Sequence, residues 1–268
     1  MDLKTSKDIA NKTFCYWTVA DGHHAKMAQT MVKSARDCGV QEDFHIWTDM
    51  EHINGANVHK CGTFEKSLYM FKFHFLKEQV SSLNYDYYVF LDADNYFVNH
   101  PGDFIHMMDG HKIFAQMENE ITSPNAKRKD WWGCPVEKYK PLYEETGLKL
   151  DKIYNTNAGF WIVDKNYIDE FYNIGLNFFF YAKKKGYYNF TEEVSLAFLG
   201  HCMQNPEERT LEKTSWLWAS DWTGYWRNKL PEYADWTFED YMTGDKFPIK
   251  SNIVHCMRSK NILIKAST

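Results

Sequence analysis

Two aspartates, Asp92 and Asp94, directly follow a run of apolar and aromatic residues, Tyr87–Leu91. Such a run predicts a buried strand, and residues two apart point to the same side of a strand. The two carboxylates would therefore converge and repel each other unless a cation lies between them. Oxygen ligands of this kind suit Mg²⁺ or Mn²⁺ together with a phosphate-bearing ligand. The alternative is a polar turn after a strand, because Asp and Asn favour turns.

Strands and helices alternate in the first half of the chain, and this order predicts where the aspartates lie. We expect strands at 13–20, 44–47, 87–91 and 113–115. One helix between them would bury Met27 and Met31, and another would be capped by Thr63 and bury Phe71 and Phe75. This β-α-β order implies a parallel sheet with helices on both faces. Ligands of such sheets bind outside the carboxyl ends of the strands.

The second half of the chain is less regular. Residues 118–150 are polar, contain proline and show no clear period, and so long an irregular stretch within a domain is typically functional. A short strand at 160–163, helices over 168–178 and 191–200, and an apolar run at 253–254 follow. No linker interrupts the chain, so we expect a single domain over residues 1–268.

Composition narrows the class of partner. The net charge is −5 without a basic block, which argues against nucleic acid as a partner. Aromatic residues make up 17%, a surplus that suits platforms for bases and sugar rings. The six cysteines are scattered without a CxxC pair, which argues against a zinc cluster or a disulfide framework and fits a reducing compartment. We see no signal peptide and no membrane span, so we expect a cytoplasmic protein.

Three further segments follow the aspartates in order: Asn157-Ala158-Gly159, Thr191-Glu192-Glu193, and His255 with Lys260. Taken with the order of elements, they resemble the glycosyltransferases of the GT-A fold, nearest to the glycogenin-like or blood-group-type branches. The resemblance covers residues 13–260 and implies an α/β fold with a mixed, mainly parallel sheet flanked by helices. The ending lacks the Gly and the Lys-Pro-Trp sequence of the glycogenin-like branch.

The resemblance also implies roles for individual residues. The metal, Mn²⁺ or Mg²⁺, would be held by Asp92, Asp94 and His255. Glu193, or its neighbour Glu192, would be the catalytic carboxylate. The nucleotide-sugar donor, with UDP favoured, would contact a larger set: Thr18, Val19 and Ala20 at the base and ribose, Lys66, Lys260, Asp92, Ala93 and Asp94 at the diphosphate, and Asn157, Ala158 and Gly159 at the sugar.

Each of these residues also has a simpler structural interpretation. Asn157 and Gly159 suit a turn, because both residue types tolerate left-handed backbone conformations. Thr191 with two acids after it suits an ordinary helix start. His255 could be a hydrogen-bonded core histidine, and Lys66 a solvated lysine on an amphipathic helix.

The function implied is transfer of a sugar from a nucleotide sugar to a hydroxyl of a glycan or another acceptor. The nucleotide-binding half would span about 13–116 and the donor and acceptor half about 117–268. Trp131, Trp132 and the region 222–226 are candidates for a carbohydrate platform. The sequence is compatible with either an inverting or a retaining outcome.

Two other functions share parts of this pattern. A haloacid-dehalogenase-type phosphohydrolase also carries Asp-X-Asp after an apolar strand, but normally on the first strand, whereas two β-α units precede it here. A non-catalytic carbohydrate-binding protein would explain the aromatic surplus, but it needs no metal site at a strand end.

Overall fold

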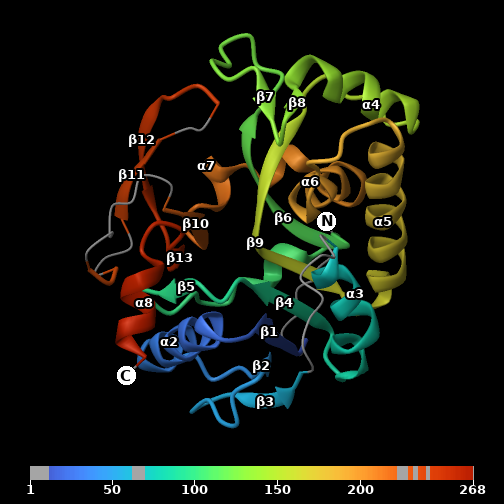
Figure 1. Cartoon of the computed structure of the whole chain (residues 1–268). Coiled ribbons are helices and arrows are strands. Elements are labelled where there is room, and N and C mark those ends of the chain that lie inside the picture. Colours follow the sequence, from blue (N-terminus) through green and yellow to red (C-terminus); the bar gives the residue numbers. More distant parts are fainter. Residues whose placement is uncertain (1–11, 62–69, 222–228, 232–234, 240–241, 268) are drawn as a thin grey trace, which may run out of the picture.

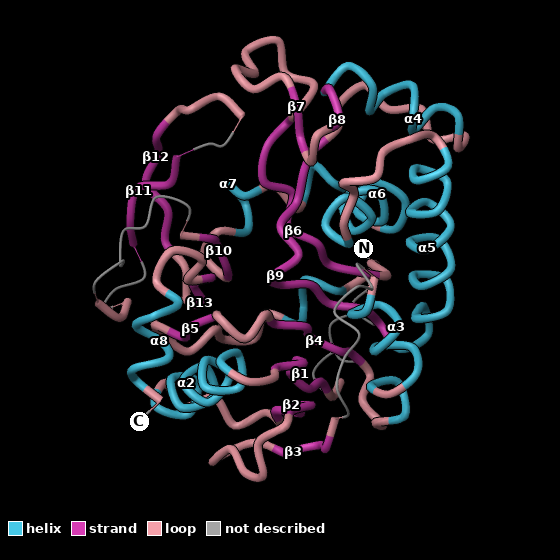
Figure 2. Tube along the Cα trace, in the orientation of Figure 1, coloured by secondary structure: helices cyan, strands magenta, loops and turns pink. Residues whose placement is uncertain are grey.

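The computed structural model describes residues 12–61, 70–221, 229–231, 235–239 and 242–267. Its main feature is a six-stranded sheet (Figures 1 and 2). In sheet order the strands are β3 (Asn57–Lys60), β2 (Phe44–Thr48), β1 (Phe14–Ala20), β4 (Tyr87–Leu91), β9 (Tyr154–Asp164) and β6 (Ile113–Glu120). The first four run parallel, and β9 is antiparallel to both of its neighbours. The expected α/β fold with a mixed, largely parallel sheet is confirmed.

Helices cover both faces of this sheet, as the β-α order predicted. Alternation along β1 sends Tyr16 to one face and Cys15 and Trp17 to the other. The Tyr16 face packs against α2 (His23–Asp37), which in turn contacts α8 (Lys260–Ala266). The Trp17 face packs against α3 (Phe71–Glu78), α5 (Ile168–Lys184) and α6 (Glu192–Met203), on the opposite side in Figure 1.

A smaller sheet lies beside the carboxyl end of β4. It consists of β10 (Trp218–Ser220), β13 (Ile253–His255) and β5 (Asn95–Phe97). The antiparallel pairing of β13 with β5 sets His255 opposite Asn95, directly after the two aspartates. Residues about 160 positions apart in sequence are thereby brought together.

The remaining elements surround the ends of the two sheets. The antiparallel pairs are β7 (Asp130–Trp131) with β8 (Cys134–Pro135), and β11 (Asp235–Glu239) with β12 (Lys246–Lys250). Two short helices are α4 (Tyr139–Glu145) and α7 (Leu211–Thr214). No helix in the described part of the chain has the length and apolar character needed to cross a bilayer.

The structure corrects the sequence-based elements in two places. Strand β3 was not expected, because only half-exposed residues with little apolar character form this edge strand. Strand β9 begins at Tyr154, so Asn157-Ala158-Gly159 lies inside a strand and not in a turn before one. The helix start predicted at Thr63 lies outside the described residues and stays a prediction; within the described residues, α3 begins at Phe71.

Candidate metal centre and flanking cavities

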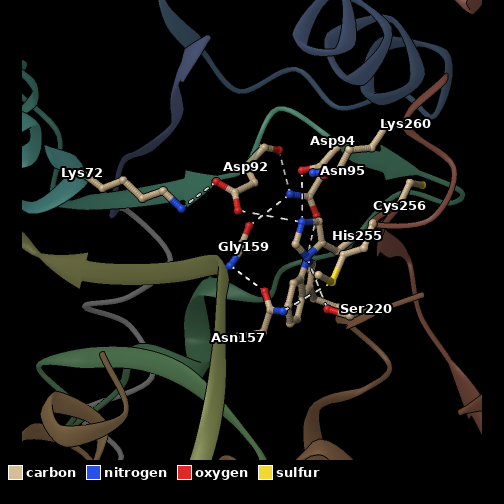
Figure 3. A network of polar contacts seen from close by, with 12 residues as sticks. Lys72, Asp92, Asp94, Asn95, Asn157, Gly159, Ser220, His255, Cys256 and Lys260 are labelled. Carbon is tan, nitrogen blue, oxygen red and sulfur yellow. Dashed lines mark hydrogen bonds and ion pairs between the residues drawn. The ribbon is translucent and has the colours of Figure 1, made fainter. Parts of the chain in front are cut away.

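Asp92, Asp94 and His255 converge at the junction of the two sheets (Figure 3). Each offers one ligand atom, and these atoms lie within 4.8 Å of one another. The Nε2 atom of His255 is 3.0 Å from Oδ1 of Asp94 and 3.8 Å from Oδ2 of Asp92. Asp94 and His255 are each only 4% exposed. Two carboxylates with one imidazole form a donor set that fits Mn²⁺ or Mg²⁺, so the three residues are a possible divalent-metal site.

Asn95 holds the turn that carries both aspartates. Its side-chain amide donates to the carbonyl of Asp92 at 2.8 Å and to that of Gly159 at 3.0 Å. Its oxygen accepts from the indole N–H of Trp218 at 2.7 Å. The amide N–H of Asp92 also donates to the Gly159 carbonyl at 2.9 Å. Because β4, β9 and β10 are tied together through one fully buried side chain, the carboxylates are held on a rigid frame.

The position of His255 depends on a close approach to the backbone of β9. A Cβ atom added at Gly159 would lie 2.6 Å from Nδ1 of the His255 ring. Gly159 is therefore required by packing against this imidazole, and not by a turn. The same ring nitrogen is 3.3 Å from the hydroxyl of Ser220, which fixes the orientation of the ring.

Two lysines balance the charge of the aspartates. The ammonium of Lys72 lies 2.8 Å from Asp92 and 3.2 Å from Glu192, and that of Lys260 lies 2.8 Å from Asp94. Burial would lower the pKa of Lys72, but Asp92 and then Glu192 raise it above its ordinary value. Burial would raise the pKa of Asp94, but His255 and then Lys260 hold it far below its usual range. Lys72 and Asp94 are therefore ionised at neutral pH.

Two cavities meet at these ion pairs. The first, of about 320 Å³, is also lined by Val19 at the end of β1, by Asp21 and His24, and by Phe71, Ala93 and Asp94. The second, of about 450 Å³, is also lined by residues of β6, β7, β9, α6 and the segment after β13: Glu118, Asp130, Trp131, Trp132, Gly133, Asn155, Asn157, Ala158, Glu193, His255 and Met257. Lys72, Asp92, Glu192 and Lys260 line both, and we call these four residues the shared border.

Glu193 faces the second cavity from the first turn of α6. Thr191 caps this helix by accepting a hydrogen bond from the Glu193 amide at 3.3 Å. The Glu193 carboxylate accepts a hydrogen bond from the indole N–H of Trp132 at 3.1 Å. Burial, and to a smaller extent the charge of Glu192, raises the pKa of Glu193 to about 7. This carboxyl can therefore take up or release a proton near neutral pH.

The residues singled out from the sequence fall into three groups. Asp92, Ala93, Asp94, His255, Lys260, Asn157, Ala158, Glu192, Glu193 and Val19 line the cavities. Thr18 and Ala20 are buried in β1, and Gly159 packs against His255. Lys66 and the Trp222 to Trp226 region lie outside the described residues.

Sequence reasoning missed Lys72, Asn95 and Ser220. A lysine on an amphipathic helix is commonplace, so nothing marks Lys72 before α3 is placed against β4. Asn95 stands next to the aspartates, and its residue type alone could have indicated a supporting role for the turn.

No protein-family model matches this chain, and no curated protein is similar to it in sequence. The chemistry of the site therefore rests on the geometry described above.

Proposed function

We propose that the chain is a metal-dependent glycosyltransferase with a GT-A-type domain. It would move a sugar from a nucleotide sugar, UDP-linked in our proposal, to a hydroxyl of a glycan or another acceptor. The observation that carries the proposal is the pair of cavities that meet at the shared border, beside three convergent metal-ligating groups. A nucleotide sugar has the matching form, because a doubly charged diphosphate joins two uncharged ends.

The first cavity suits the nucleoside. It lies at the carboxyl ends of the parallel strands, and Val19 and Phe71 offer apolar surface beside the polar Asp21 and His24. The second cavity suits the sugar and its acceptor, since Asn157 provides a buried amide and Trp132 an aromatic face. The diphosphate would then lie along the shared border.

Charge develops on the leaving diphosphate as its bond to the anomeric carbon breaks. Lys72 and Lys260 would stabilise that charge, because both belong to the shared border and both carry an ammonium group there. A divalent cation bound by Asp92, Asp94 and His255 would add Lewis-acid stabilisation of the same oxygens.

Glu193 is the catalytic carboxylate in this proposal, and Glu192 is not. Glu192 is engaged by Lys72 at the border, whereas Glu193 faces the sugar cavity with a pKa near 7. In an inverting reaction Glu193 would take the proton of the acceptor hydroxyl. In a retaining reaction the same carboxylate would stabilise the positive anomeric carbon.

The phosphohydrolase alternative fits the site less well. That chemistry needs one aspartate as a nucleophile and the second as a proton donor. Asp94 is buried against His255 and Lys260, and its pKa is far below the usual range, so it holds no proton to donate at neutral pH.

The proposal is tested by incubating the protein with Mn²⁺ and a panel of nucleotide sugars without an acceptor. Release of the nucleoside diphosphate from one donor, lost on removal of the metal with a chelator, is the expected result. Phosphate release from simple phosphate esters would support the phosphohydrolase instead. Sugar binding that is unchanged in Asp94→Asn, without turnover of any donor, would support a carbohydrate-binding protein.

A further inference from the structure

The turn between β7 and β8 has an unusual residue in a strained conformation. Register pairs Asp130 with Pro135 and Trp131 with Cys134, so Trp132 and Gly133 form a two-residue hairpin turn. Both have positive φ, 50° and 69°, as a type I′ turn requires. Asn or Gly normally occupies the first of these positions. Trp132 is the one non-glycine residue with positive φ in the described part of the chain.

Backbone strain of this kind persists only where surrounding contacts maintain it. The Tyr139 hydroxyl donates to the carbonyl of Trp131 at 2.7 Å, which anchors the hairpin from the buried side. Gly133 packs against the side chain of Asn189, because an added Cβ would lie 2.7 Å from its Nδ2. With the backbone held in this way, the Trp132 indole reaches Glu193, and both residues line the second cavity.

The indole N–H is a suitable partner for a carboxylate that exchanges protons. It is a donor only, so it stabilises the ionised form of Glu193 without competing for the proton. Within the described residues, this is the one hydrogen bond that the Glu193 carboxylate accepts. Trp132 is 40% exposed, so burial of its ring does not explain the strained turn.

We propose that Trp132 is a positioning residue for Glu193, and that the strained turn exists to present its indole N–H to this carboxylate. The catalytic consequence rests on the proposed function, but the hydrogen bond and its effect on Glu193 do not. Other charged groups around Glu193 come from several elements: Glu192 on α6, Lys72 on α3, Asp130 on β7, Glu118 on β6, and His255 and Lys260 near β13.

Two substitutions separate positioning from a purely structural role. Trp132→Phe keeps an aromatic ring and the strained backbone but removes the N–H donor. Trp132→Asn relieves the strain, because Asn tolerates positive φ, and it also removes the indole. Trp216→Phe is the matched control, since Trp216 is 38% exposed and does not line either cavity.

The measurement is the titration of the Glu193 carboxyl, followed by ¹³C NMR and assigned with Glu193→Gln. We expect the midpoint to rise in both Trp132 variants and to stay unchanged in Trp216→Phe, while Trp132→Asn unfolds at the same or a higher temperature. If donor turnover is found, the rising limb of its pH profile should move to higher pH by the same amount. The turnover rate at pH 6 should then fall by about tenfold. Unchanged Glu193 titration in Trp132→Phe would overturn the inference. A shifted midpoint in a protein that turns over no donor would support the inference while the proposed function fails.

Discussion

The metal site with its shared border and the Glu193 end of the second cavity hold their carboxylates in opposite ways. At the metal site and the border, Asp92, Asp94 and Glu192 each contact a lysine, and Asp92 and Asp94 also lie against His255. By contrast, within the described residues the Glu193 carboxylate accepts its one hydrogen bond from a neutral indole, and its pKa is raised to about 7. Asp94 therefore stays ionised at neutral pH, whereas the Glu193 carboxyl can change its charge there. A site that must hold a diphosphate and also move a proton needs both kinds of environment.

Asp94→Asn should have the largest effect, because it replaces a carboxylate ligand with a neutral amide and removes half of the aspartate charge. We expect Mn²⁺ binding to be lost in calorimetry and donor hydrolysis to fall by about 10³-fold. Asp103→Asn is the control, since Asp103 is exposed and lines neither cavity. Unchanged Mn²⁺ affinity in Asp94→Asn would remove the basis for a metal centre here.

The neighbouring glutamates test the comparison directly. Glu193→Gln should lower kcat by about 10²-fold with little change in KM, because it removes the group that exchanges a proton. Glu192→Gln should mainly raise KM for the donor, since it leaves Lys72 with one partner fewer at the shared border. Steady-state kinetics on both variants distinguish the two roles. Equal losses of kcat would mean that the two carboxylates do not differ as we describe.

Gly159→Ala tests how His255 is positioned. The added methyl group would lie against the imidazole, so we expect the ring to move and metal affinity to fall by about tenfold. The control is a double-mutant cycle with His255→Ala. If Gly159→Ala weakens the metal site further when His255 is already absent, the effect acts through another contact.

The smallest expected effect concerns stability and pH. The folded state raises the pKa of Glu193 from 4.5 to about 7, so it binds more protons than the unfolded chain between these values. The stabilisation that the Glu193 proton provides is therefore complete below pH 4.5, and it is lost as the pH rises to about 7. Because the carboxyl is only partly buried, we expect Glu193 to contribute about 1 kcal/mol to the free energy of unfolding. Urea unfolding at pH 5 and 8 should show a smaller difference in Glu193→Gln than in the unaltered chain, and an equal difference would contradict the raised pKa.

Local sequence patterns predicted the elements that depend on local chemistry. The apolar run before Asp92 forms β4, and Thr191 with its two acids begins α6 as the capping pattern indicated. Composition and element order were sufficient for the α/β fold and for the carboxyl end of β4 as the candidate site.

What could not be predicted depends on pairing between distant segments. Only the resemblance placed His255 with the aspartates, because the pairing of β13 with β5 that brings it there has no local pattern. Lys72 has its role only because α3 packs across β4. For Gly159 the sequence offered a contact to the donor sugar or a turn, whereas in the structure it packs against an imidazole from nearly 100 positions later.

Strand β9, which is antiparallel to both of its neighbours, carries a position at which the volume of the second cavity can be changed by substitution. Pairing with β4 from Phe160 onward, and with β6 at Thr156 and Trp161, anchors the strand on both sides of Ala158 along the chain. Ala158 lines this cavity with a single methyl group, so Val or Leu there would take up ligand volume and leave the strand in place. Libraries at this one position could then select for smaller ligands while Asp92, Asp94 and His255 stay untouched.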